Sequence, residues 1–131
     1  MDINYGEVWF AKFPYDEDEN QIRLRSVIIL DVDVHEVLVV KVAKLDSRKY
    51  VDFDLPILYW REAKLEIESI TRISQTLYLP RKAFDFKIGD IDEYDLKAIQ
   101  EPFKKFISLS LRRTLGRLLI YFNPLIMQAR K

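Results

Sequence analysis

The stretch LRSVIILDVDVHEVLVVKVA, residues 24–43, decides the fold class of this chain. It holds two runs rich in β-branched residues, 24–32 and 36–43, separated by the short connection Asp33, Val34 and His35. Branched side chains favour extended backbone because they pack well on a pleated surface. Two such runs joined by a short polar connection predict an antiparallel hairpin in the core.

The residues before this hairpin predict one more strand and a loop. Residues 6–13, GEVWFAKF, combine aromatic and β-branched residues in the pattern of a strand that ends at Pro14. Residues 15–21, YDEDENQ, are acidic and polar and have no apolar period. They predict a long loop between the first strand and the hairpin.

Beyond the hairpin the elements become short. We expect a polar turn at 44–49, a strand at 50–56, a helical turn at 59–64, and strands at 69–74 and 75–79. Several short strands at this spacing in one small domain predict a compact barrel or sandwich.

Helix is expected mainly at the C-terminal end. Asp92 can cap a helix with Asp95 at its third position, and apolar residues then recur at helical spacing from Leu96 onward. Pro102 predicts a kink or a break near Glu101, because proline removes a backbone hydrogen bond and clashes with the preceding turn. A second apolar stripe along residues 107–122 is expected to stop at Asn123 and Pro124. The chain is therefore predicted to be mainly β, in the α+β class.

Composition excludes several classes of protein. The chain has 131 residues, 49% of them hydrophobic and 32% charged, which is the profile of one packed globular domain. It has no cysteine, so it offers no disulfide, no thiolate nucleophile and no cysteine-based zinc site. Neither a signal-peptide pattern nor a run of about 18 apolar residues is present, so we expect a cytoplasmic protein without a membrane partner.

Charge is divided unevenly along the chain. Residues 1–101 carry 14 Lys and Arg against 21 Asp and Glu, whereas residues 102–131 carry seven cations and no acid. The net charge of zero therefore gives no general attraction to nucleic acid, and a site in the body of the protein must rely on a few placed cations.

Known local motifs of cofactor and metal chemistry are missing. The sequence has no Walker loop, no dinucleotide-binding glycine pattern, no metal-binding histidine pair and no serine nucleophile elbow. We expect no cofactor and no metal, which leaves metal-free chemistry or plain binding.

Five blocks in order resemble the MazF/PemK toxins. GEVWFA at residues 6–11 and RSVIIL at 25–30 resemble the G-[DE]-[IV]-[WY] and R-P-[VA]-[LIV]-[VI] strands of that family, with Ser26 in place of its proline. WREAKL at 60–65, SITR at 69–72 and IGDIDEYDL at 88–96 resemble its A-G-L turn, its S-x-[VI]-[RL] strand and its I-G-x-L-[ST]-x-x-[DE]-[LM] helix start. The match is collinear from about residue 5 to 110.

The resemblance implies an SH3-like barrel of the CcdB/PemK type with a C-terminal helix. It also implies a homodimer that cuts single-stranded RNA at short motifs without a metal, as the toxin of a type II toxin–antitoxin system. Its further partner would be a cognate antitoxin whose disordered segment fills the RNA groove. We expect a toxin domain at residues 1–112 and a basic amphipathic extension at 113–131 that packs on the same domain or on a dimer mate.

The same resemblance implies the catalytic residues. Arg25 stands at the position of the principal catalytic arginine, whose fixed charge and two-pronged donor geometry suit a phosphate that gains negative charge when a 2′-hydroxyl attacks it. Where the family has threonine or serine after the third strand, this chain has Asp46 followed by Ser47. Either Ser47 supplies the hydroxyl while Asp46 accepts a proton, or Asp46 repels the phosphate, or both simply form a polar turn.

Further side chains are candidates for RNA contact. Arg23, Lys44, Arg48 and Arg72 are predicted to bind RNA, with ordinary surface charge as the alternative. Trp9, Phe10 and Phe13 could stack on unpaired bases, although two of the three are expected in the core.

Two other functions stay open at this stage. The chain could be a catalytically inactive relative that acts as a binding protein, or a toxin of CcdB-like fold that acts on a protein target.

Overall fold

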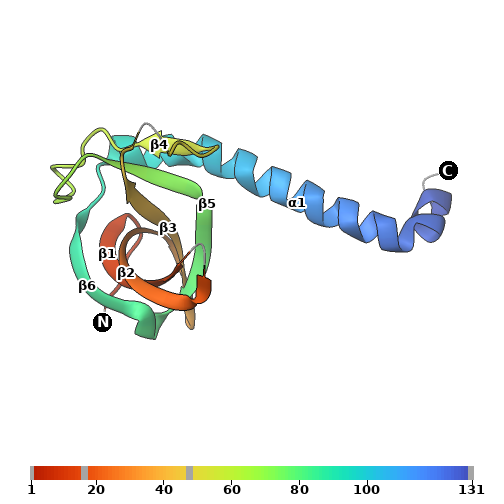
Figure 1. Ribbon diagram of the computed structural model, residues 1–131, viewed down its shortest axis with the longest axis horizontal. Helices are drawn as coiled ribbons and strands as arrows, with labels where there is room; N and C mark the ends of the chain where they lie inside the picture. The colour runs from red at the N-terminus through yellow and green to blue at the C-terminus, as the bar shows by residue number, and fades with distance from the viewer. Residues whose placement is uncertain (1, 16–17, 47–48, 130–131) are drawn as a thin grey trace.

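The computed structural model describes residues 2–15, 18–46 and 49–129. Six antiparallel strands form one sheet in the order β4-β5-β3-β2-β1-β6, which curls into a barrel beside a long helix (Figure 1). In chain order the elements are β1 (Glu7–Tyr15), β2 (Asp18–Val32), β3 (Glu36–Lys44), β4 (Asp54–Pro56), β5 (Ser69–Pro80), the 3-10 turn η1 (Arg81–Ala83), β6 (Phe84–Asp90) and α1 (Glu93–Ala129). The predicted class, mainly β with a C-terminal helix, is confirmed.

The predicted hairpin is the centre of the sheet. β2 and β3 pair from Val27 and Lys41 to Val32 and Val37. Their alternate residues join two different buried clusters, one on each face, which is why the sequence shows continuous apolar runs instead of a strict alternation.

The predicted loop at residues 15–21 is wrong for most of its length. β1 extends to Tyr15 and β2 already begins at Asp18, and these two residues are register partners. Backbone hydrogen bonds between two strands do not depend on side-chain polarity, so an acidic stretch can extend a hairpin whose side chains carry no apolar signal.

Two other strand predictions also need correction. Of the strand expected at 50–56, only Asp54–Pro56 is extended. The two strands expected at 69–74 and 75–79 are one bent strand, β5. Its register against β3 shifts between Thr76 and Arg72, so the intervening residues form a bulge. In the sequence, these residues interrupt the strand pattern and therefore look like a boundary between two strands.

β6 was not predicted, and a glycine explains how it packs. The helical turn predicted at 59–64 is present as a turn over residues 58–64, which lies against β6. A Cβ built on Gly89 would lie 2.4 Å from the backbone oxygen of Ala63. Only glycine allows this close approach. The sequence pattern at residues 88–96 predicts a helix start and does not predict this packing.

The start of α1 is confirmed in one respect and corrected in another. Asp92 caps the helix, since its Oδ1 accepts a hydrogen bond from the Tyr94 amide at 2.9 Å. Asp95 does not complete a capping box. Its buried carboxylate instead accepts the amides of Leu58 and Tyr59, both at 2.9 Å, and so ties α1 to the helical turn.

The helix continues through both of its prolines. Of the two expectations for Pro102, a kink or a break, the break does not occur, and α1 also runs past Asn123 and Pro124 to Ala129. Its first half lies along the barrel and its second half extends away from it (Figure 1). In the described ranges, no helix has an apolar stretch that could cross a membrane.

Candidate functional site: a row of cations on the barrel

Arg25 lies on β2 opposite Ala11 of β1 and is half-buried. Because side chains alternate along a strand, it shares a face with the core residues Val27 and Ile29. Its Nη1 donates a hydrogen bond to the Leu24 carbonyl at 3.1 Å. The predicted catalytic arginine thus lies at the edge of the core, where the apolar part of β2 ends.

Two further cations face the same side of the sheet. Lys41 of β3 is the register partner of Val27 on one side and of Arg72 of β5 on the other. Residues directly opposite, such as Lys41 and Arg72, have Cβ atoms about 4.5–5.5 Å apart. Arg25 lies two residues before Val27, where the pairing of β2 with β3 begins. Three strands therefore place three positive side chains on one face of the sheet.

Lys41 is the least expected member of this group. It is only 9% exposed, and its ammonium lies 5.8 Å from the centroid of the Phe13 ring, at a distance that allows a cation–π contact. A buried ammonium is costly to desolvate unless it is paired, which makes Lys41 unusual in an apolar strand.

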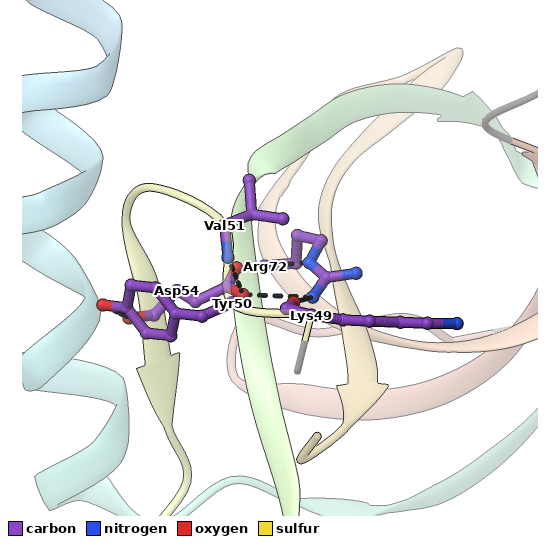
Figure 2. Close-up of polar contacts among 5 residues, drawn as sticks. All are labelled: Lys49, Tyr50, Val51, Asp54 and Arg72. Carbon is purple, nitrogen blue, oxygen red and sulfur yellow. Dashed lines mark hydrogen bonds and ion pairs between the residues drawn. The ribbon is translucent and has the colours of Figure 1, made fainter. Parts of the chain in front are cut away.

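Arg72 holds the connection between β3 and β4 in place. Its guanidinium donates to both carboxylate oxygens of Asp54, at 3.2 and 3.0 Å, and to the Lys49 carbonyl at 2.9 Å (Figure 2). The Asp54 side chain is fully buried and also accepts the Val51 amide at 3.0 Å. This charge-assisted network fixes residues 49–54.

The other predicted site residues are less closely grouped. Arg23 is exposed and shares the face of Arg25, whereas Lys44 is exposed at the end of β3. Asp46 is half-buried in the following connection, and its carbonyl accepts the Lys49 amide at 3.0 Å. Ser47 and Arg48 lie outside the described residues. The structure thus places Arg25, Lys41 and Arg72 on one face, and the RNA contacts of all these residues stay predictions.

Sequence reasoning missed Lys41 and Asp54. A signal for Lys41 was present, since it is the single charge within the apolar run of residues 37–43. Asp54 gave no such signal, because acidic residues are common in polar connections and only the fold shows that this one is buried opposite Arg72.

The opposite face of the sheet carries a groove of about 350 Å³. Phe10 lies in its wall, whereas Trp9 and Phe13 are only 5% and 2% exposed and belong to the core. The prediction that two of these three aromatic residues are core residues is confirmed.

The arrangement around Arg25 suits an anionic ligand better than a metal. In the described part of the chain, no three histidine, aspartate or glutamate side chains gather into a group that could hold a metal ion. Fixed guanidinium and ammonium groups on one face can bind a phosphate and stabilise charge that develops on its oxygens.

Comparisons with known proteins identify the family of the chain. The sequence model of the PemK-like, MazF-like toxins of type II toxin–antitoxin systems matches residues 4–107. No curated protein matches the chain in sequence.

Solved structures of low identity share the fold. The Mycobacterium tuberculosis toxin MazF-mt6 has 16% identity and a TM-score of 0.58, with 78% of this chain and 96% of that chain covered. An endoribonuclease from mycobacterial species has 8% identity and a TM-score of 0.61, with 82% and 94% covered. An endoribonuclease in complex with its cognate antitoxin, also mycobacterial, has 9% identity and a TM-score of 0.61, with 80% and 94% covered.

Proposed function

Because the chain belongs to the PemK-like, MazF-like toxins of type II toxin–antitoxin systems, we propose that it is an endoribonuclease that cuts single-stranded RNA at short motifs without a metal ion. The observation that carries this proposal is that Arg25, Lys41 and Arg72 lie on one face of the barrel, with Lys41 and Arg72 directly opposite each other and Arg25 two residues before Val27, the partner of Lys41 on β2. The mycobacterial endoribonucleases of the same fold support it.

The proposed reaction is an internal transesterification of RNA. The ribose 2′-oxygen bonds to the adjacent phosphorus while the bond from phosphorus to the 5′-oxygen breaks, which leaves a cyclic phosphate and a 5′-hydroxyl end. The 2′-hydroxyl loses its proton to a base, and the departing 5′-oxygen gains one. Arg25 stabilises the negative charge that builds on the phosphate oxygens, and this charge is larger in the transition state than in the substrate.

Asp46 and Ser47 are the proposed source of the proton chemistry. Asp46 lies two residues after the end of β3, in the connection whose later part Arg72 and Asp54 hold. In this role Asp46 accepts the 2′-hydroxyl proton and Ser47 orients the phosphate by its hydroxyl group. Arg23, Lys44, Arg48 and Arg72 are proposed to contact the RNA on either side.

Two partners complete the proposal. We propose that the chain acts as a homodimer and is inhibited by a cognate antitoxin with a disordered inhibitory segment. The antitoxin is supported by the complex formed by the mycobacterial relative of the same fold.

Controlled expression in a bacterial host tests the proposed activity. Wild type is expected to stop growth and to fragment cellular RNA, and Arg25→Ala is expected to relieve both effects, with a loss of roughly 100-fold or more in cleavage. Arg112→Ala, which changes an exposed arginine of α1, is the matched control and is expected to stay toxic.

One observation favours a second function. Asp46 replaces the threonine or serine of the family, and a carboxylate beside a phosphate repels it. Intact RNA in cells that hold folded wild-type protein would favour a non-cleaving relative that keeps the barrel as a binding module.

A further inference from the structure

The groove on the face opposite Arg25 is built around an aromatic pair, the half-buried Phe10 and the exposed Phe86. Ser26, Phe10 and Phe86 are register partners across β2, β1 and β6, and all three line the groove. The Phe10 and Phe86 ring centroids are 5.2 Å apart, and Phe86 is 52% exposed. The exposed Phe86 ring, supported by Phe10 at an interplanar angle of 37°, offers an aromatic face of the kind on which unpaired bases stack.

The polar groups of the groove fit a nucleotide. Lys44 at the end of β3 and Lys64 at the end of the helical turn line it, and both side chains are exposed. Two cations beside an aromatic pair stand out in a body that carries a net negative charge. The Glu66 carboxylate also lines the groove and could accept a hydrogen bond from the exocyclic amino group of a base.

One residue of the groove, Ser26, directly follows Arg25 in the sequence. Ser26 and Arg25 are consecutive residues of β2 and point to opposite faces. In the described part of the chain, β2 and β3 pair from Val27 and Lys41 onward, so β2 before this point continues beside β1, and β3 beside β5. The groove lies where these two strands part, between Ser26 and Lys44.

We propose that this groove binds an unpaired base of the RNA, next to the phosphate held by Arg25, and that it contributes to the choice of cleavage sequence. Phe86 and Phe10 stack on the base, and Lys44 and Lys64 contact its flanking phosphates. This inference rests on the proposed ribonuclease function. It adds base-binding residues to the three cations Arg25, Lys41 and Arg72.

Phe86→Ala tests the stacking contact. The probe is a fluorescent single-stranded RNA that contains the cleavage motif, with a 2′-deoxy sugar at the cleaved position to prevent reaction. Loss of one stacked base is expected to raise the Kd by about 5- to 150-fold. Phe86→Tyr keeps the ring and is expected to bind like wild type.

Tyr78→Ala is the matched control for this experiment. Tyr78 is 55% exposed on β5 and does not line the groove, so its removal is expected to change the Kd by less than about twofold. Thermal unfolding of each variant checks that the barrel is intact.

The two lysines are tested by salt dependence. Lys44→Met and Lys64→Met are each expected to reduce the slope of log K against log salt concentration by about 0.7, the value for one phosphate contact with a single strand. Lys82→Met changes an exposed lysine of η1 outside the groove and is expected to leave the slope unchanged.

The outcomes separate this inference from the function on which it rests. Normal affinity and an unchanged cleavage sequence in folded Phe86→Ala, with active wild type, would overturn the base site alone. A change in sedimentation with unchanged RNA affinity would also overturn it, because the groove would then be a contact between copies. Wild type that neither binds nor cuts RNA would overturn the proposed function itself.

Discussion

At the scale of single residues, Lys64 shows how the chain departs from its family pattern. Its φ is +64°, its amide donates to the Arg61 carbonyl, and the Leu65 amide donates to the Trp60 carbonyl, which together form a Schellman ending of the helical turn. Glycine is favoured at this position because a Cβ is strained there, which explains the glycine of the family's A-G-L turn.

Lys64→Gly is therefore expected to stabilise the protein. The free energy gained by relieving the left-handed backbone strain should exceed the cost of the greater conformational entropy that glycine gives the unfolded chain. The free energy of unfolding should therefore rise by about 0.5–1 kcal/mol. Urea denaturation measures this difference. Glu62→Gly, in the same turn but without a positive φ, is expected to be destabilising, and a loss of stability in Lys64→Gly would contradict the assignment.

Glu7 links stability to pH at the same scale. Burial raises the pKa of its carboxyl, but hydrogen bonds from Lys87, Trp9 and the Asn4 amide, together with the Lys87 charge, lower it by more, so the net pKa lies below the ordinary 4.5. Lys87 Nζ is 2.9 Å from Glu7 Oε2, and Trp9 Nε1 donates to Oε1 at 3.1 Å.

A lowered pKa makes this carboxylate stabilising in its ionised form. The contribution is fully present above the unfolded pKa near 4.5 and is lost as the pH falls through the lower folded value. Between about pH 6 and pH 3, the urea midpoint of wild type is expected to fall further than that of Glu7→Gln. Parallel curves for the two proteins would show that Glu7 contributes no such linkage.

At the scale of elements, close packing of β6 on the helical turn depends on Gly89. A Cβ at Gly89 would meet the backbone oxygen and carbon of Ala63, which cannot rotate away as a flexible side chain could. Gly89→Ala is expected to lower the free energy of unfolding by about 1–3 kcal/mol. Asp85→Ala, an exposed change on the same strand, should alter it by less than about 0.5 kcal/mol, and equal effects of the two would contradict the packing.

The elements also show what the sequence could predict. The hairpin of β2 and β3 was predictable because burial on both faces requires long β-branched runs. β6 was not predicted, although Phe84, Phe86 and Ile88 alternate with polar residues and glycine in the pattern of a strand, so its signal was present in the sequence. The β5 bulge and the extension at Asp18 depend on register between distant segments, which the sequence does not show.

The residues of the candidate site also differ in whether the sequence alone could predict them. Arg25 and Arg72 were predictable from family blocks, because those blocks are local in sequence. Lys41 joins them only through the pairing of three strands, and Asp54 only through its burial against Arg72. Cross-strand neighbours of this kind become visible once the register is known.

At the scale of the whole molecule, the barrel is expected to fold without the end of α1. In the part of this helix whose burial is described, up to residue 113, Asp95 and Ile99 are buried and Phe103 and Phe106 are half-buried. Removal of residues 113–131 should change the Tm by no more than a few degrees, as measured by circular dichroism. A large loss of Tm would mean that the extension is part of the domain, and a change confined to sedimentation would place it against a dimer mate.

The most direct test of the central claim is metal-free cleavage by the purified protein. Wild type, Arg25→Ala and the control Arg112→Ala would be incubated with a long single-stranded RNA in excess chelator, and the fragment ends mapped. The account predicts cuts at one recurring short motif with wild type and Arg112→Ala, and a loss of roughly 100-fold or more with Arg25→Ala. Cuts of equal rate and position with Arg25→Ala, or intact RNA with folded wild type, would contradict it.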